Sequence, residues 1–134
     1  MTKQTAHVLV AEDEALAALG MQLMLTRWGY RVTLAKDGLH AIECEEQDPS
    51  VDLLVTDLRM PRLDGRGLIR QLRIKYADLP VVVTSGYVSP EIAYELETQI
   101  NRRIRVLCKP FDPADLRASV GALLAGRPRE MNGP

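Results

Sequence analysis

Five short apolar runs alternate with five helix-forming segments along this chain, and that alternation restricts the possible folds more than any other feature. Parallel strands need crossover connections, usually helices, and strands buried on both faces are almost continuously apolar. The alternation therefore predicts an α/β fold in which a parallel sheet lies between layers of helices. The expected strands are Val8–Ala11, Tyr30–Ala35, a run from Leu53 that stops at Asp57, Pro80–Thr84 and Ile104–Cys108.

The segments between these runs carry helix start and stop signals. Ser89 and Asp112 each precede a proline, which is typical of an N-cap followed by the first helical residue. Gly29 is placed to end the first helix, which we expect over residues 15–28, and Asp48-Pro49 to end a helix over 38–46. Five such units fit a flavodoxin-like (βα)5 three-layer sandwich with sheet order 2-1-3-4-5. The apolar stripes predicted for the helices are Leu16, Leu19 and Leu23; Ala41 and Ile42; Leu68, Ile69, Leu72 and Tyr76 on a helix over 67–76; Ile92, Leu96 and Ile100; and Leu116, Val120 and Leu123.

The length and charge of the chain exclude several classes of protein. Its 134 residues suffice for one domain, which we place at residues 7–125 between tails at 1–6 and 126–134. The formal charge of −1 gives no global attraction to nucleic acid or anionic membranes, so we expect no direct DNA binding. No apolar run approaches the length of a bilayer span, and the polar N-terminus resembles no signal peptide, so we expect a cytoplasmic protein without a membrane anchor.

Two cysteines are too far apart in the sequence to suggest a zinc site or a disulfide framework. Cys44 and Cys108 have no nearby cysteine partners. We interpret both as reduced thiols in core or half-buried positions, as expected for a cytoplasmic protein.

Acidic residues follow two of the expected strands at the point where each strand ends. Asp57 ends the third run, and Pro61 and Asp64-Gly65 then favour a loop. Glu12 and Asp13 follow the first run. In the predicted sheet order the ends of strands 1 and 3 are neighbours, so the three carboxylates should converge and repel each other. Oxygen ligands of this kind favour a hard cation, which we expect to be Mg²⁺.

Two more polar residues fall at the ends of neighbouring strands. Ser85 follows the fourth run and Lys109 follows the fifth. A metal ion, an ammonium group and a hydroxyl around one carboxylate make a phosphoryl-transfer site, with Asp57 as the nucleophile. Taken singly, each residue also has an ordinary reading as a turn, loop or helix-start residue, and we keep that reading for Glu14. Their joint occurrence at strand ends favours the phosphoryl-transfer site.

The chain from about Val8 to Leu124 resembles the receiver domain of two-component response regulators. The motifs that carry the resemblance are Val8-Leu-Val-Ala-Glu-Asp-Glu14, Asp57-Leu-Arg-Met-Pro-Arg-Leu-Asp-Gly65, Thr84-Ser-Gly86 and Lys109-Pro-Phe111. The resemblance implies that Asp57 is the phosphoacceptor, that Glu12, Asp13, Asp57 and the backbone carbonyl of Arg59 bind Mg²⁺ or Mn²⁺, and that Ser85 and Lys109 contact the phosphoryl group.

The same resemblance implies partners and a switching surface. The phosphoryl donor would be a histidine kinase or a histidine phosphotransfer protein, and the output an unidentified protein target. Phosphorylation would change the surface of helix 4, strand 5 and helix 5, near the basic segment 101–105. The protein would catalyse only its own phosphorylation and dephosphorylation, and would not be an enzyme with a separate substrate. A homodimer is left open.

This chain departs from the usual receiver pattern at a few positions. Glu12 stands where many members have Asp, and Val106 where many carry an aromatic residue that moves inward on activation. With Val106 at this position, we expect no movement of an aromatic residue to report activation in this chain. The resemblance implies that Arg59 and Tyr87 flank the path of a hydrolytic water, and we expect them to shield the phosphoryl group and slow its loss. The Ser-Gly-Tyr sequence is similar to receivers of hybrid kinases and stand-alone receivers.

Three other classes of protein share part of this pattern. A haloacid-dehalogenase-type phosphatase needs an acid two residues after its nucleophile, where this chain has Arg59. A flavodoxin needs a phosphate-binding loop after the first strand, where the acidic Glu12 and Asp13 would repel a phosphate. A receiver-like interaction module that is never phosphorylated remains the alternative, although all the expected side-chain types are present.

Overall fold

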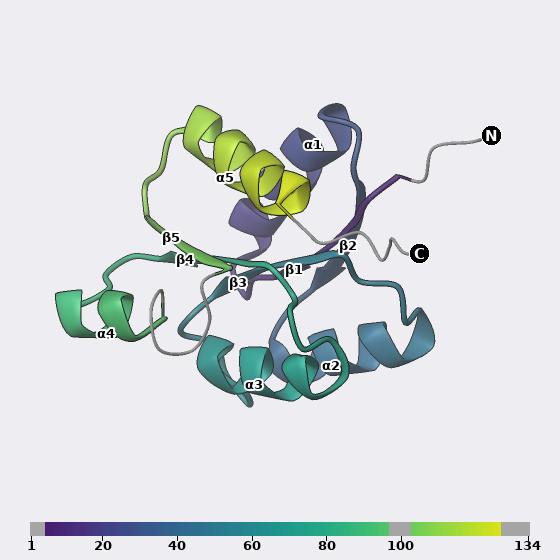
Figure 1. Cartoon of the computed structure of the whole chain (residues 1–134), viewed down its shortest axis with the longest axis horizontal. Coiled ribbons are helices and arrows are strands. Elements are labelled where there is room, and N and C mark those ends of the chain that lie inside the picture. Colours follow the sequence, from purple (N-terminus) through teal and green to yellow (C-terminus); the bar gives the residue numbers. More distant parts are fainter. Residues whose placement is uncertain (1–4, 97–102, 127–134) are drawn as a thin grey trace.

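The structure is a computed structural model, which describes residues 5–96 and 103–126. It consists of strands and helices in strict alternation, as the sequence predicts (Figure 1). The strands are β1 (His7–Ala11), β2 (Arg31–Ala35), β3 (Leu53–Asp57), β4 (Val81–Ser85) and β5 (Ile104–Cys108), and the helices are α1 (Ala15–Arg27), α2 (Gly38–Gln47), α3 (Gly65–Lys75), α4 (Pro90–Tyr94) and α5 (Pro113–Ala125).

The five strands form one parallel sheet of order β2-β1-β3-β4-β5, which confirms the predicted topology. Val10 of β1 lies beside Leu34 of β2 and Val55 of β3, so β1 occupies an interior position. The β1 and β3 ends that carry the acidic residues are therefore neighbours. β5 pairs only with β4 within the described residues, and its outer edge is open.

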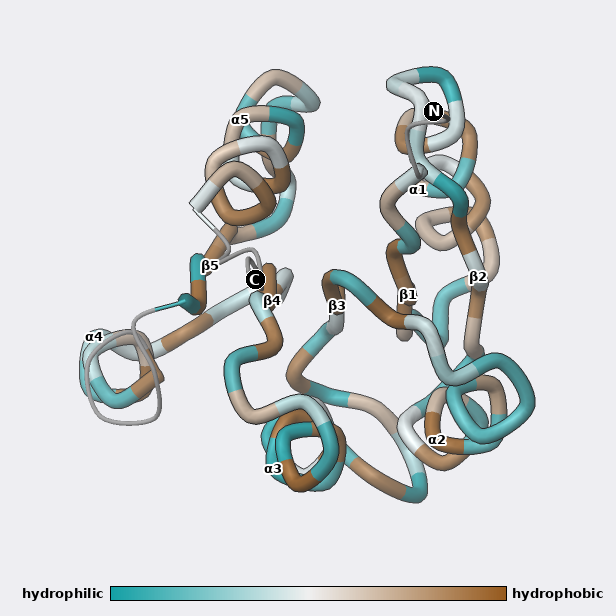
Figure 2. Tube along the Cα trace, turned by 45° about the vertical axis from the view of Figure 1, so that its right-hand side comes forward, coloured by the Kyte–Doolittle hydropathy of each residue, from teal (hydrophilic) through white to brown (hydrophobic). Residues whose placement is uncertain are grey.

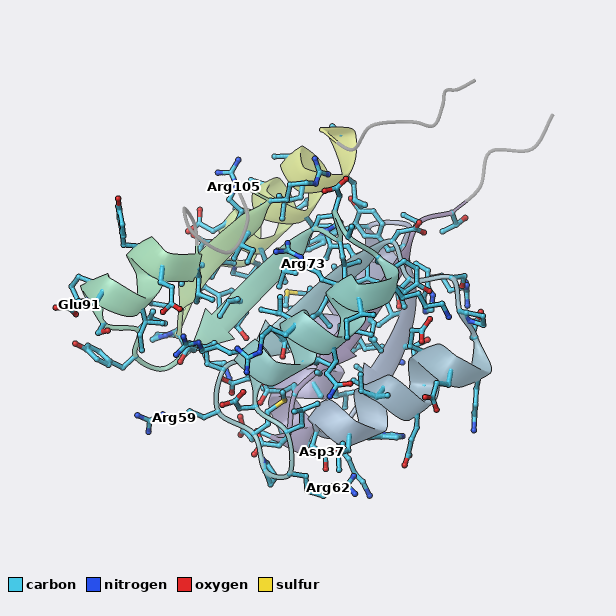
Figure 3. All side chains as sticks on the ribbon, turned by 60° about the horizontal axis from the view of Figure 1, so that its bottom comes forward. Asp37, Arg59, Arg62, Arg73, Glu91 and Arg105 are labelled. Carbon is cyan, nitrogen blue, oxygen red and sulfur yellow. The ribbon has the colours of Figure 1, made fainter. Side chains whose placement is uncertain are left out.

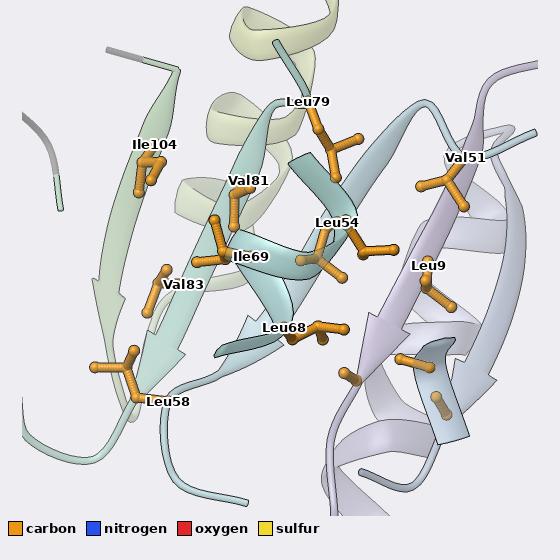
Figure 4. Packing of buried hydrophobic residues seen from close by; sticks show 14 of the residues in the cluster. Leu9, Val51, Leu54, Leu58, Leu68, Ile69, Leu79, Val81, Val83 and Ile104 are labelled. Atoms are coloured by element: carbon orange, nitrogen blue, oxygen red, sulfur yellow. The ribbon is translucent and has the colours of Figure 1, made fainter. Parts of the chain in front are cut away.

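Each face of the sheet has its own hydrophobic core because the strands alternate their side chains between two helix layers. Figure 1 places α1 and α5 on one face and α2 and α3 on the other. Figure 4 shows Leu68 and Ile69 of α3 over Leu54 and Val81 of the sheet. On the opposite face, Met21 and Leu25 of α1 belong to one cluster with Val8, Val10, Leu53, Val55, Val82, Leu116, Val120 and Leu123. The tube coloured by hydropathy has its hydrophobic stretches along the strands between these layers (Figure 2).

Side-chain caps fix where four helices begin. Ser89 accepts a hydrogen bond from the amide of Ile92, and Asp112 from that of Ala114, so both predicted N-caps are confirmed. Asp37 caps α2 in the same way. Asp64 caps α3, which begins at Gly65, two residues before the predicted start, because the sequence 64–65 serves as a helix start as well as a turn. The predicted end of the first helix shifts by one residue, to Arg27.

The leucine stripe predicted for the first helix does not face the core. Leu16, Leu19 and Leu23 are 78%, 47% and 63% exposed, whereas Ala18, Met21 and Leu25 are buried. This helix is apolar on most of its sides, so periodicity alone could not identify the side that packs on the sheet. The other stripes are buried or half-buried, and Ile100 lies outside the described residues. Among the described helices, none is both long and apolar enough to cross a bilayer.

Candidate functional site

The carboxyl ends of four strands bring the predicted site residues to one edge of the sheet. Glu12 follows β1 directly, Asp57 is the last residue of β3, and Lys109 follows β5. Ser85, expected just after its strand, is the last residue of β4 and is buried. This edge is where open α/β sheets bind their ligands.

The three acidic side chains predicted to converge do lie together. Glu12, Asp13 and Asp57 each offer a carboxylate oxygen, and these oxygens lie within 4.8 Å of one another. Glu12 is buried, Asp57 is half-buried and Asp13 is exposed, so the cluster runs from the interior to the surface. Because hard divalent cations prefer oxygen ligands and tolerate retained waters on the solvent side, this donor set fits Mg²⁺.

Lys109 already neutralises part of this charge. Its ammonium group donates to Glu12 Oε1 at 2.9 Å and to Asp57 Oδ2 at 3.1 Å. Burial lowers the pKa of Lys109, but the hydrogen bonds to the two carboxylates outweigh burial and raise that pKa overall. The lysine therefore stays protonated at neutral pH. The like-charge repulsion expected from the sequence is smaller than three carboxylates alone would produce, and the excess negative charge lies on the Asp13 side.

The loop between β3 and α3 forms one wall of the site. The backbone amide of Arg59 donates to Asp57 Oδ1 at 3.3 Å, and the amide of Gly65 donates to the carbonyl of Leu58 at 2.9 Å. A shallow pocket lies between this loop and Asp13, which follows β1; it is lined by Asp13, Leu58, Arg59, Met60, Pro61 and Asp64. Asp57 is thus oriented from two sides, by Lys109 on one oxygen and by the Arg59 amide on the other.

The side chains expected to modulate the site, those of Arg59, Tyr87 and Val106, form no hydrogen bond with Asp57. The guanidinium of Arg59 points outward from the protein (Figure 3). Tyr87 is 69% exposed, and Val106 is half-buried against the core beneath α3 and α4. The Ser85 hydroxyl donates to the carbonyl of Tyr87 at 3.1 Å and accepts from the Tyr87 amide at 3.4 Å. Ser85 therefore holds the start of the β4–α4 loop.

An apolar groove of about 550 Å³ borders Lys109 on the α1 side. It is lined by Ala17, Gly20, Met21, Met24, Lys109, Pro110 and Phe111. The exposed leucines of α1, Leu16, Leu19 and Leu23, belong to the same helix. Apolar area of this kind beside a polar site is typical of a protein-binding surface.

Two sequence expectations change in the β5 region. Arg103 of the predicted basic segment donates to the carbonyls of Leu123 and Gly126, whereas Arg105 is exposed; residues 101 and 102 lie outside the described residues. Cys44 is half-buried as expected, but Cys108 is exposed, contrary to the prediction. Cys108 is the last residue of β5, which forms the edge of the sheet, and side chains at the end of an edge strand have fewer neighbours.

Sequence reasoning missed two ion pairs near the site. Arg62 pairs with Asp37, and Arg66 of α3 pairs with Glu95 beside α4 at 2.7 Å. Asp37-Gly38 has the form of a helix start, which could have identified the cap. No local signal could have identified the arginine partners, because they lie 25 and 29 residues away along the chain.

Comparison with known proteins agrees with this geometry. Residues 8–121 match the family model of the response regulator receiver domain. Transcriptional regulatory protein ZraR of Escherichia coli (strain K12) is 32% identical over 126 residues, which cover 93% of this chain and 28% of ZraR. Sensor kinase CckA of Brucella abortus is 35% identical over 121 residues, which cover 90% of this chain and 13% of CckA. The chain thus spans less than a third of the length of these curated relatives.

Solved structures resemble the whole described domain. A response regulator receiver protein from Sinorhizobium medicae is 31% identical, with a TM-score of 0.81 over 92% of this chain and 97% of that one. The chemotaxis protein CheY4 of Vibrio cholerae is 25% identical, with a TM-score of 0.82 over 90% of this chain and 100% of that one.

Proposed function

Because this chain belongs to the response regulator receiver domain family, we propose that it accepts a phosphoryl group on Asp57 in a Mg²⁺-dependent reaction. The observation that carries the proposal is the double anchoring of the Asp57 carboxylate, by Lys109 at 3.1 Å and by the Arg59 amide at 3.3 Å. This anchoring beside a cluster of acidic oxygens fits a nucleophile that is positioned in advance. The donor would be a histidine kinase or a histidine phosphotransfer protein.

In this reaction an Asp57 oxygen attacks the phosphorus of a phosphohistidine. A P–O bond forms, the P–N bond breaks, and the imidazole leaves with its electron pair and is protonated by solvent. Lys109 donates hydrogen bonds to the oxygens on which negative charge gathers. Glu12, Asp13, Asp57 and the Arg59 carbonyl would hold Mg²⁺, or Mn²⁺ in its place, and the bound cation supplies positive charge that offsets the carboxylates and the phosphoryl oxygens. The chain turns over no separate substrate.

Ser85 is the residue that would report phosphorylation. Its hydroxyl has one proton, which is now donated to the Tyr87 carbonyl. Donation to a phosphoryl oxygen would remove that bond and release the β4–α4 loop, which leads into α4. Because Val106 is small, we infer that the change reaches the α4–β5–α5 surface as a shift of loop and helix, biasing an existing equilibrium.

We infer that the donor binds the α1 groove. A phosphohistidine must approach Asp57 closely, so the surface that binds the donor must border the site. The groove is lined by Met21 and Met24 of α1 together with Phe111 and Lys109, and Lys109 also contacts Asp57. An amphipathic helix of the donor fits such a surface. Gly20→Asp, which places a charge in the groove without a clash, should slow transfer from a donor protein but leave phosphorylation by acetyl phosphate unchanged.

The direct test of the proposed function is intact mass spectrometry after incubation with acetyl phosphate. Wild type should gain one phosphoryl group in Mg²⁺ and none in excess chelator, and Asp57→Ala should gain none in either. Equal labelling with and without chelator would contradict the metal requirement. No labelling of wild type under any condition, including with a set of histidine kinases, would favour the alternative of a receiver-like interaction module that is not phosphorylated.

We also propose that the phosphoryl group is long-lived. Arg59 has no acceptor atom to take a proton from water, and the Tyr87 ring is large enough to cover Asp57. The Arg59 side chain points outward (Figure 3) and Tyr87 is 69% exposed, so shielding requires both side chains to move over Asp57 on phosphorylation. The measurement is phosphoryl loss from donor-free protein. If Arg59→Asn and Tyr87→Ala lose phosphate no faster than wild type, the two side chains do not shield the group.

The remaining properties follow from the family and the charge of the chain. We expect the domain to act in the cytoplasm on a protein target, without contacting DNA or membrane directly. Homodimerisation can be tested by measuring the molecular mass in solution, with and without phosphorylation.

A further inference from the structure

The β3–α3 loop, residues 58–64, contributes backbone atoms to the site. The Arg59 amide orients Asp57, and the Arg59 carbonyl is an expected metal ligand. Residues 58–61 also line the pocket beside Asp13. The position of this loop therefore sets the geometry of one whole side of the site, and any contact that fixes the loop also fixes the site.

Arg62 in this loop has an unusual backbone conformation. Its φ is +72°, in the left-handed region, and it is the only residue other than glycine with a positive φ within the described residues. For a long side chain this conformation costs on the order of 1 kcal/mol, and such outliers persist only where surrounding contacts hold them. Glycine or asparagine would adopt it more readily, so the arginine side chain needs its own explanation.

The arginine side chain makes a two-point ion pair with Asp37. Arg62 Nε donates to Asp37 Oδ2 at 2.8 Å, and Nη2 donates to Oδ1 at 2.9 Å. The Asp37 side chain is nearly buried, and its Oδ1 also accepts from the His40 amide at the start of α2. The Arg62 hydrogen bond lowers the pKa of Asp37, so this carboxylate remains charged. Figure 3 shows the two side chains together at this end of the molecule.

Backbone contacts reinforce the same connection. A Cβ atom at Gly38 would lie 2.2 Å from the carbonyl oxygen of Leu63, and one at Gly65 would lie 2.3 Å from the carbonyl oxygen of Asp57. Only glycine fits at these two positions. The first turn of α2 thus contacts the loop directly, next to the ion pair, and the end of the loop contacts β3.

We propose that the Asp37–Arg62 ion pair is a positioning pair for the phosphoacceptor site, which holds the β3–α3 loop where Arg59 contacts Asp57 and the expected cation. The inference rests on the proposed function for the identity of the cation. Capping of α2 needs Asp37 alone, so it does not account for the forked contact with Arg62. The pair links the loop to a helix start that is itself anchored in the fold.

Simple electrostatics and positioning predict different results, which makes the proposal testable. Arg62→Asn keeps a residue that tolerates positive φ but removes the cation, and Asp37→Asn keeps an oxygen for the cap but removes the charge. By Coulomb's law alone, loss of the arginine would strengthen Mg²⁺ binding and loss of the aspartate would weaken it. Positioning predicts that both variants weaken binding by about tenfold.

The measurement is Mg²⁺ affinity by isothermal titration calorimetry, with hydrogen exchange of the Arg59 and Gly65 amides in chelator. The double variant should bind no more weakly than either single variant, because the two residues act as one unit. Arg70→Asn, on the exposed side of α3, is the matched control and should leave affinity and exchange unchanged. We expect faster exchange of both amides in each loop variant.

Two results would overturn the proposal, and a third concerns only the proposed function. Unchanged Mg²⁺ affinity in both variants would mean that the ion pair does not position the site and has only a structural role. Opposite changes in the two variants would mean that charge alone acts. If wild type binds no Mg²⁺, the metal part of the proposed function fails, and hydrogen exchange then tests the positioning of the loop by itself. Unchanged exchange of the Arg59 amide in the two variants would refute that positioning.

Discussion

Two buried polar side chains at opposite ends of β1 differ in the partners that surround them. His7 begins the strand and Glu12 follows its end, and each is only 2% exposed. His7 Nδ1 lies 3.3 Å from the Ser50 carbonyl, so this nitrogen carries the proton, and Nε2 accepts from the Thr33 hydroxyl at 2.7 Å. Glu12 instead pairs with Lys109 within a cluster that has further carboxylates and an opening to solvent.

The difference separates a structural polar cluster from a functional one. Around His7 neutral partners satisfy both ring nitrogens, Arg31 and Asp48 pair with each other, and Asp52 accepts from the His7 backbone amide. At the other end one ammonium group serves two carboxylates, and Asp13 adds a third. A polar group satisfied within the protein stabilises the fold, whereas uncompensated like charge is stabilised by a ligand. Four measurements can test this contrast.

The largest effect is expected at the functional end. Lys109→Met keeps the apolar stem but leaves buried Glu12 without its cation, which should lower the free energy of unfolding by about 2–3 kcal/mol in chelator. We place this below the cost of a fully buried pair because the Lys109 side chain is 26% exposed. Mg²⁺ should restore part of the loss by binding the folded state. Urea denaturation with and without Mg²⁺ provides the measurement, and equal destabilisation in both conditions would argue against charge as the cause.

The next effect is expected at the structural end. His7→Leu removes both ring nitrogens and leaves the Thr33 hydroxyl and Ser50 carbonyl without this partner, at a cost of about 2 kcal/mol. The double variant with Thr33→Val should recover part of that cost, because two apolar partners need no hydrogen bond. Mg²⁺ should stabilise these variants by the same amount as wild type. A reduced response to Mg²⁺ would show that the two ends of β1 are not independent.

Removing the negative charge of Asp13 at the functional end should stabilise the protein in chelator, opposite in sign to the two changes above. Asp13→Asn relieves repulsion, so in chelator it should raise the free energy of unfolding by about 0.5 kcal/mol while abolishing most stabilisation by Mg²⁺. Glu46→Gln, an exposed change on α2, is the control and should alter neither quantity. Thermal unfolding in chelator and in Mg²⁺ measures both. A destabilised Asp13→Asn would mean that the apo cluster is already balanced.

The smallest effect is a pH dependence at the structural end. Burial, together with nearby Arg31, lowers the pKa of His7 below 6.5, so the fold favours the neutral ring. The stability linked to His7 is complete above pH 6.5 and declines as the pH falls toward the lower folded-state pKa, because only the unfolded chain gains the proton. Between pH 7.5 and 5.5 the melting temperature of wild type should fall by about 2 °C more than that of His7→Leu. Parallel curves for the two proteins would exclude His7 as the cause.

The local pattern of the sequence determined the fold and the edge of the sheet at which the candidate site residues lie. Five apolar runs between helix signals required a parallel sheet with crossovers, and the residues at the strand ends, Glu12, Asp57, Ser85 and Lys109, then had to share one edge. These predictions succeeded because strand alternation, caps and strand ends are set by residues close together in the chain.

Only the tertiary structure decided which groups satisfy one another. It turned Leu16, Leu19 and Leu23 outward, because α1 is apolar on several sides and the sheet accepts only one of them. It placed Lys109 between Glu12 and Asp57, and it brought Arg62 to Asp37 across 25 residues. Such pairings depend on distances between elements, which no local sequence pattern records. A charged residue appears the same in the sequence whether water, a ligand or a distant side chain compensates its charge.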